Sequence, residues 1–257
     1  MFHIHLGLDG LAKTMVITSY VLWFFALAFM VVQGFRQKSY GMPPFAITSM
    51  LGVCLICCVG PWIEPSLFYP KDHLAVVWCW RGWAMLMLLL FFQYLVWGKH
   101  YPYRILEFKK HFYLIAFGSL FSSIVMAWTF INFYQDYYVN STCALFAVLP
   151  MSIGYFGTLY TRPKLRGLSV TVAWSLTIGT ALLYGGTVLG GMDASYPKHI
   201  ETGYHFIYAL FLITVVLNVA YSIMLTRRRH ELHEDYDHKI TLRRLHGFDL
   251  ERASPVL

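Results

Sequence analysis

A few polar and charged residues interrupt the long apolar runs of this 257-residue chain, and their chemistry needs an explanation. Arg81 lies within an apolar run from Leu74 to Trp97, close in sequence to Trp78 and Trp83. An arginine between aromatic faces can bind an anion or an ether oxygen, so these three residues are candidate binding residues. The alternative is an arginine that extends to an aqueous interface, where tryptophans also gather.

Three amide side chains lie within other apolar runs, namely Gln93, Asn132 and Asn218. Hydrogen bonds between helices are the ordinary role of such groups in a membrane. Polar side chains are nevertheless costly there and often mark functional sites. Asn218 is therefore also a candidate catalytic residue.

Two carboxylic acids adjoin the apolar runs. Glu64 follows Trp62, and Asp193 follows Gly190-Gly191-Met192. Loop carboxylates of this kind are usually solvated. A carboxyl buried beneath interfacial aromatic side chains would have a raised pKa and could donate a proton. Glu64 and Asp193 are the candidate proton donors of the chain.

The elements that must position these residues are seven runs without Asp, Glu, Lys or Arg. About 20 apolar residues in a helix cross the hydrocarbon of a bilayer. The sequence therefore predicts an all-α integral membrane protein with seven transmembrane helices over residues 1–226, followed by a polar cytosolic tail over 227–257. A soluble enzyme core is excluded. The runs cover residues 14–35, 39–63, 82–98, 111–135, 137–161, 167–192 and 202–226.

The basic residues predict the orientation of these helices. Sixteen of the 20 Lys and Arg residues fall on one side of the predicted membrane and four on the other. Basic residues stay cytosolic, so the N-terminus is expected outside or in the lumen and the C-terminus in the cytosol. The net charge of +7 then reflects topology and contact with the lipid bilayer, not binding to nucleic acid.

Several local features bear on processing and shape. Asn140 begins an Asn-Ser-Thr sequon on the predicted lumenal side, where glycosylation is possible. Pro150 lies inside the fifth run and is expected to kink its helix. The tail after Leu225 is mixed in charge, which favours partial disorder or a short surface helix. Histidines in the tail are not spaced as a tight metal-ligand set, and no metal or cofactor signature is visible.

Three groups of residues resemble the small seven-helix membrane-bound terpene cyclases of fungal meroterpenoid and indole-diterpene pathways. The first is Tyr40-Gly41-Met42-Pro43, which opens the second helix. The second runs from Met151-Ser152 through Arg162-Pro163 and Arg166-Gly167-x-Ser169 to Gly179-Thr180, and the third is Asn218-x-x-Tyr221. They match in order and spacing over roughly residues 10–226.

The resemblance implies an enzyme of secondary metabolism that cyclises a prenyl chain, commonly one with a terminal epoxide, without a cofactor. In the family, an acid in helix two and an acid in helix seven are thought to protonate the epoxide. Here Val53-Cys54 stand at the family's Trp-Glu pair and Asn218 stands at its Asp, so both expected acids are absent. Glu64 or Asp193 would then be a relocated donor, and Cys54 and Tyr221 are candidate substrate-binding residues.

Three functions remain open at this point. The first is a terpene cyclase of the isomerase or lyase type, acting on a hydrophobic prenylated molecule in the endoplasmic reticulum membrane. The second is a divergent member that opens or isomerises epoxides or acts as a non-catalytic helper. The third is an unrelated seven-helix transporter or receptor, although no repeated half or paired broken helices are visible. The oligomeric state does not follow from the sequence.

Overall fold

The computed structural model describes residues 6–63, 74–100, 109–134, 144–162, 165–189 and 201–245, and no strand occurs in these ranges. Short helical turns precede or follow some of the long helices. One is the 3-10 turn η1 (Gly98–His100), and another is the π-helical turn η2 (Ala144–Val148). The α-helices are α1 (Leu6–Gln37), α2 (Pro44–Ile63), α3 (Leu74–Trp97), α5 (Phe112–Tyr134), α7 (Leu149–Thr161), α8 (Val170–Leu189) and α9 (Glu201–Leu245).

Each of the seven charge-free runs coincides with a helix or a pair of consecutive helical segments. Five helical segments of the described ranges are long and apolar enough to cross a membrane, while Pro44–Gly60 is a shorter apolar helix. Large apolar side chains such as Leu114, Phe121 and Phe133 are mostly exposed on the outside of the bundle, where only lipid tails could cover them. The prediction of an all-helical integral membrane protein is therefore confirmed.

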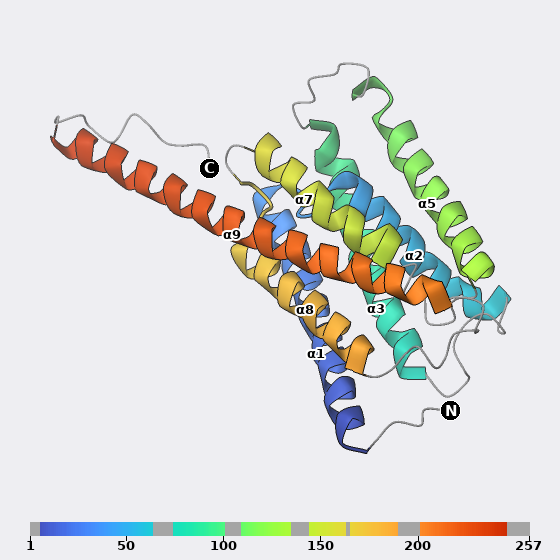
Figure 1. Cartoon of the computed structure of the whole chain (residues 1–257). Coiled ribbons are helices and arrows are strands. Elements are labelled where there is room, and N and C mark those ends of the chain that lie inside the picture. Colours follow the sequence, from blue (N-terminus) through green and yellow to red (C-terminus); the bar gives the residue numbers. More distant parts are fainter. Residues whose placement is uncertain are drawn as a thin grey trace.

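The helices form one bundle in which neighbours in space are often far apart in sequence (Figure 1). The first helix, α1, packs along α8, and α9 packs against both α7 and α8. On the other flank, α2 packs between α3 and α5. Figure 1 shows α5 at the edge of the bundle and the C-terminal part of α9 extending well beyond it.

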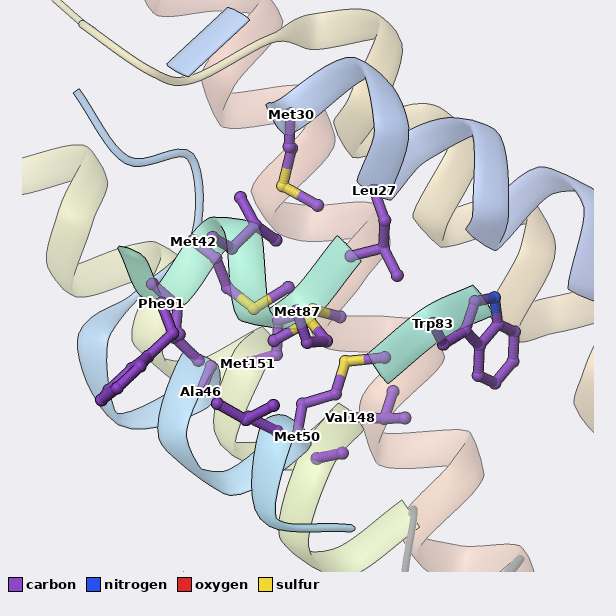
Figure 2. Packing of buried hydrophobic residues seen from close by; sticks show 14 of the residues in the cluster. Leu27, Met30, Met42, Ala46, Met50, Trp83, Met87, Phe91, Val148 and Met151 are labelled. Carbon is purple, nitrogen blue, oxygen red and sulfur yellow. The ribbon is translucent and has the colours of Figure 1, made fainter. Parts of the chain in front are cut away.

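The interior of the bundle is rich in methionine. Figure 2 shows side chains from α1, α2, α3, α7 and the segment before α2 gathered around one region of the core. Methionine is flexible and fills irregular spaces, so this core can adapt its shape more readily than a core of branched side chains. The buried methionines are Met30, Met42, Met50, Met87 and Met151.

Pro150 does not kink the middle of a helix as predicted. It lies at the start of α7, directly after the π-helical turn η2. A proline is tolerated at this position because its missing N–H would have no partner within the first turn. The change from π to α geometry therefore falls next to Pro150, and the carbonyl of Val148 accepts a hydrogen bond from the Ser152 hydroxyl at 2.9 Å.

Residues of the first and second motif groups meet at the end of the bundle where α1 stops. The buried Arg162 donates from Nη1 to the carbonyls of Tyr40 (2.6 Å) and Arg166 (2.9 Å), and its guanidinium lies 4.4 Å from the centre of the Tyr40 ring. Gly167 donates its backbone N–H to Gln37 Oε1 at 2.6 Å. The segment between α7 and α8 is thereby fastened to the segment between α1 and α2.

Gly167→Ala is expected to weaken this fastening. Gly167 has a φ of +78°, and a Cβ atom there would lie 2.7 Å from the Tyr40 carbonyl oxygen. Strain of this kind costs about 1–3 kcal/mol. The midpoint of thermal unfolding, followed by labelling of the buried Cys54 and Cys57 thiols in detergent, should fall by several degrees.

Gly157→Ala is the matched control, because a Cβ atom at this helical position of α7 meets nothing within 4 Å. Alanine stabilises a helix more than glycine does, so the midpoint of thermal unfolding should stay the same or rise. Equal losses in both variants would show that the fastening contributes nothing particular to stability.

The part of the predicted tail that the structure describes, residues 227–245, is helical, whereas the sequence favoured partial disorder or a short surface helix. The last helix α9 runs without a break from Glu201 to Leu245, past the basic residues that end the predicted span. Elongation of an existing helix needs no new nucleus, so even a polar segment can continue it. Arg228 donates to the Leu159 carbonyl (2.6 Å) and Arg229 to the Leu168 carbonyl (3.3 Å), which ties the start of the extension to α7 and to the segment before α8.

Candidate functional site

Asn218 lies at the centre of a buried polar cluster formed by three helices. Its side chain is 3% exposed, and its Oδ1 accepts a hydrogen bond from Ser152 of α7 at 2.7 Å. Its Nδ2 donates to Thr180 Oγ1 of α8 at 3.5 Å. Asn218 precedes Arg227 by nine residues, about 13 Å along α9, so the cluster lies deep within the apolar bundle.

The hydroxyl groups around Asn218 are also bonded within their own helices. Ser152 donates to the Val148 carbonyl at 2.9 Å and Thr180 to the Leu176 carbonyl at 2.7 Å. Thr177 of α8 extends the cluster, because its hydroxyl contacts both the backbone carbonyl of Asn218 (3.2 Å) and Ser222 Oγ (2.9 Å). The interhelical role expected for Asn218 is confirmed.

The other two amide side chains, Gln93 and Asn132, differ in whether their hydrogen bonds join two helices. Gln93 of α3 donates to the Val31 carbonyl of α1 at 2.6 Å, so it joins two helices as predicted. Asn132 donates to the Trp128 carbonyl of its own helix and is exposed, so the interhelical prediction was wrong for that residue.

Tyr221, a predicted substrate-binding residue, is buried one turn from Asn218. Its ring stacks on Tyr155 of α7 with centroids 4.7 Å apart and an interplanar angle of 20°. The Tyr155 hydroxyl contacts Met30 Sδ of α1 at 3.4 Å. This aromatic pair therefore connects the polar cluster to the methionine-rich core.

Cys54, at the position of the family's glutamate, is fully buried on α2 and belongs to the hydrophobic core. The side chain at this position is therefore enclosed in the bundle, and it is a small thiol in place of the acid that the resemblance implies. A buried free cysteine behaves as a small hydrophobe.

The structure separates the three residues of the predicted Arg81 group. The Arg81 guanidinium lies 4.8 Å from the centre of the Trp78 ring, and Trp78 is 60% exposed on the outside of the bundle. Trp83 is buried and contacts Trp80, Trp23 and Tyr20. Arg81 and Trp78 thus form a cation–π pair that includes an exposed ring, which agrees better with the alternative of an arginine that extends outward than with a closed binding group. Trp83 faces the interior.

Three predicted site residues, Glu64, Asp193 and Asn140, lie outside the described residues. Their roles as proton donors and as a glycosylation site stay predictions.

The residues of the three motif groups meet in two clusters, in which contacting residues are up to 122 positions apart in sequence. Ser152, Thr180 and Asn218 share one hydrogen-bonded cluster, and the Tyr40 and Arg162 groups share the other. The sequence identified Asn218 as a candidate but not Ser152, Thr177, Thr180 and Ser222 as its neighbours. The three-residue spacing of Thr177 and Thr180 on α8 and the four-residue spacing of Asn218 and Ser222 on α9 were the available signal in the sequence.

Comparison with known families agrees with this arrangement. The sequence profile of the Pyr4-like transmembrane terpene cyclases matches residues 5–231. The chain belongs to this family. Searches of curated proteins and of solved structures give no match. The matched region includes every described residue of the Asn218 cluster and of the Arg162 contacts, so this Pyr4-like protein is an integral membrane member of a terpene-cyclase family with neutral residues at Cys54 and Asn218.

Proposed function

We propose that this Pyr4-like protein cyclises a hydrophobic prenylated substrate, one bearing a terminal epoxide, within the membrane. The observation that supports this best is the buried cluster of Ser152, Thr180 and Asn218, which is formed by the segments that resemble the family's motifs. A hydrogen-bonding group held deep in an apolar bundle can orient an oxygen of a lipophilic molecule.

The proposed reaction is an isomerisation and needs no cofactor. A carboxyl group protonates the epoxide oxygen, the C–O bond breaks, and an alkene of the same chain attacks the electron-poor carbon. Loss of a proton from carbon ends the sequence, and the atoms of the substrate all remain in the product. Glu64 is the first candidate donor and Asp193 the second, because Asn218 and Cys54 cannot supply an acidic proton readily.

Aromatic rings would stabilise the positive charge that develops on the substrate carbon. The buried faces of Trp83, Tyr155 and Tyr221 can stabilise positive charge by their quadrupoles. The methionine-rich core can adapt to a bulky chain. We place Asn218 and Ser152 as the groups that orient the substrate oxygen, with Cys54 and Tyr221 lining the chain.

The neutral residues at both acid positions favour one further candidate function. A Pyr4-like protein without the family's acids could open or isomerise an epoxide without closing rings, or could assist another enzyme. Product analysis separates these possibilities. Heterologous expression in a host fed epoxyprenylated intermediates should yield cyclic isomers. Recovery of a ring-free allylic alcohol or diol would support the alternative, and unchanged substrate would contradict catalysis.

We further propose seven spans in the endoplasmic reticulum membrane, with a lumenal N-terminus and a cytosolic C-terminus. The contacts of Arg162, Arg228 and Arg229 gather basic residues of separate segments at one end of the bundle, which supports this topology.

A reporter fused after Leu257 should accordingly be active only in the cytosol, and a tag before Met1 should be protected inside sealed microsomes. Glycosylation at Asn140, tested by a mobility shift that Asn140→Gln removes, would agree. A lumenal C-terminal reporter would contradict the seven-span arrangement.

A further inference from the structure

Among the buried polar atoms of α1 without a hydrogen-bond partner in the described part of the chain, which also include Gln33 Oε1, two are hydrogen-bond donors. They are the indole N–H of Trp23 and the hydroxyl of Ser19, and their side chains are 3% and 0% exposed. A serine in a helix usually bonds to a carbonyl of the preceding turn, and a buried tryptophan usually finds an acceptor. Unpaired polar groups are costly in an apolar interior, so the two groups together call for a reason.

The two residues form a single feature. They are four positions apart on α1 and therefore lie on the same face of the helix. That face packs on α8, because a Cβ atom at Gly179 would lie 2.6 Å from Cδ1 of the Trp23 indole. Glycine at this position of α8 is what allows the indole to approach so closely.

Aromatic rings surround one side of this feature. Trp83 of α3 lies 6.4 Å from the Trp23 ring centre and makes edge contacts with Tyr20 at 5.3 Å and Trp80 at 5.1 Å. Trp23 thus belongs to an aromatic cluster from α1 and α3 that consists of Tyr20, Trp23, Trp80 and Trp83. Such surroundings suit a lipophilic molecule with one oxygen atom, not an ion.

The feature lies at the depth of the Asn218 cluster. Trp23 contacts Gly179, and the next residue of α8, Thr180, contacts Asn218. This also gives a physical reason for the Gly179-Thr180 pair, since its first member admits Trp23 and its second pairs with Asn218. Two hydrogen-bonding positions at one depth could hold two polar ends of a substrate or position one end near the reacting centre.

We propose that Trp23 and Ser19 form a subsite that donates hydrogen bonds to an acceptor oxygen, such as an epoxide or carbonyl, of a lipophilic substrate. This inference takes the class of substrate from the proposed function, whereas the geometry of the subsite is independent of that proposal. Trp23 is the principal donor because its N–H is fixed by the indole ring, and Ser19 supports it from the preceding turn.

Binding to the full-length protein in lipid nanodiscs tests the subsite. The probes are farnesyl phenyl ether and its terminal epoxide, which differ by one oxygen. A net hydrogen bond contributes about 1 kcal/mol, so the wild type should bind the epoxide several-fold to about tenfold more tightly than the parent ether. Trp23→Phe keeps an aromatic ring but removes the N–H, and the ratio of the two Kd values should fall to about one.

Trp174→Phe is the matched control. The Trp174 N–H donates to Thr226 Oγ1 at 3.3 Å, away from α1, so the variant should keep the wild-type ratio. If Trp23→Phe does not fold, Ser19→Ala decides, and a reduced ratio supports the subsite. An unchanged ratio in the folded variant, or equal binding of both probes by the wild type, overturns it and would assign the two groups to water or to packing alone.

Product formation is measured separately on the same preparations. Discrimination between the probes without any cyclic product would leave the subsite standing and reject the proposed cyclisation. Cyclic product with an unchanged ratio in Trp23→Phe would reject the subsite and leave the proposed function standing.

Discussion

Replacing Asn218 with leucine is expected to lower the turnover of an epoxyprenylated substrate about a hundredfold, the loss typical of removing a group that orients or stabilises a reacting oxygen. Leucine keeps most of the volume. The hydroxyls of Ser152 and Thr180 keep their bonds to the Val148 and Leu176 carbonyls, so the change leaves no buried donor without an acceptor. The amount of folded protein in the membrane should therefore stay near the wild-type amount.

Asn132→Leu is the control for this prediction, because the Asn132 amide bonds only to its own helix in the described structure and faces outward. Its turnover should match the wild type. Full activity in Asn218→Leu would reduce Asn218 to a packing residue and remove it from the site.

Asn218→Asp separates the role of the amide from that of polarity. The new carboxylate costs about 3 kcal/mol at the centre of a membrane unless it takes up a proton. If Asn218 orients a substrate oxygen by its amide, turnover should fall sharply although the aspartate is the residue expected from the family. Near-normal turnover would instead show that the position only needs a polar group of that size.

Glu64→Gln is expected to abolish the product while expression remains normal. Opening an epoxide needs an acid that is protonated near neutral pH, and the described interior offers a thiol at Cys54 and an amide at Asn218 in the two positions where the family carries acids. Glu64 adjoins Trp62 and Pro65 at the predicted lumenal end of the second span. Glutamine has nearly the same shape and cannot donate an acidic proton. Cyclic product is measured by mass spectrometry on isolated membranes.

Asp193→Asn is the matched variant from the other predicted lumenal loop and should keep most of the activity. An active Glu64→Gln together with an inactive Asp193→Asn would move the acid to Asp193. Activity in both variants would mean that neither carboxyl starts the reaction.

The helices could be predicted from the sequence because absence of charge over about 20 residues has one physical explanation in a chain of this composition. The end of α9 could not. Arg227 marks the end of the apolar run, but an established helix continues through polar residues at low cost, and the sequence does not show where it stops.

The site was only partly predictable for a similar reason. Asn218 was visible because an amide is unusual in an apolar run. Serine and threonine are common in membrane helices, where they bond to their own backbone, so Ser152 and Thr180 could not be assigned as partners of Asn218 before α7, α8 and α9 were placed side by side. Ser19 and Trp23 needed the packing of α1 on α8, which joins segments about 150 residues apart.

For Arg81 the prediction failed in the opposite way, because it grouped residues that the structure separates. Its tryptophan neighbours in the sequence suggested one binding group, but a helix turns by 100° per residue and sends Trp78 and Trp83 to different faces. Only Trp83 reaches the interior. Closeness in sequence therefore did not mean closeness in the site.

The most direct test is incubation of the purified full-length protein in nanodiscs with a single epoxyprenylated aromatic compound, followed by exact mass and NMR analysis of the product. The proposed cyclisation predicts a product of unchanged mass in which the epoxide has become a hydroxyl group and a new carbocycle is present, formed by the wild type and by Asn132→Leu and about a hundredfold more slowly by Asn218→Leu. Recovery of the linear epoxide from the wild type, or formation of a hydrated diol in place of a cyclic isomer, would contradict it.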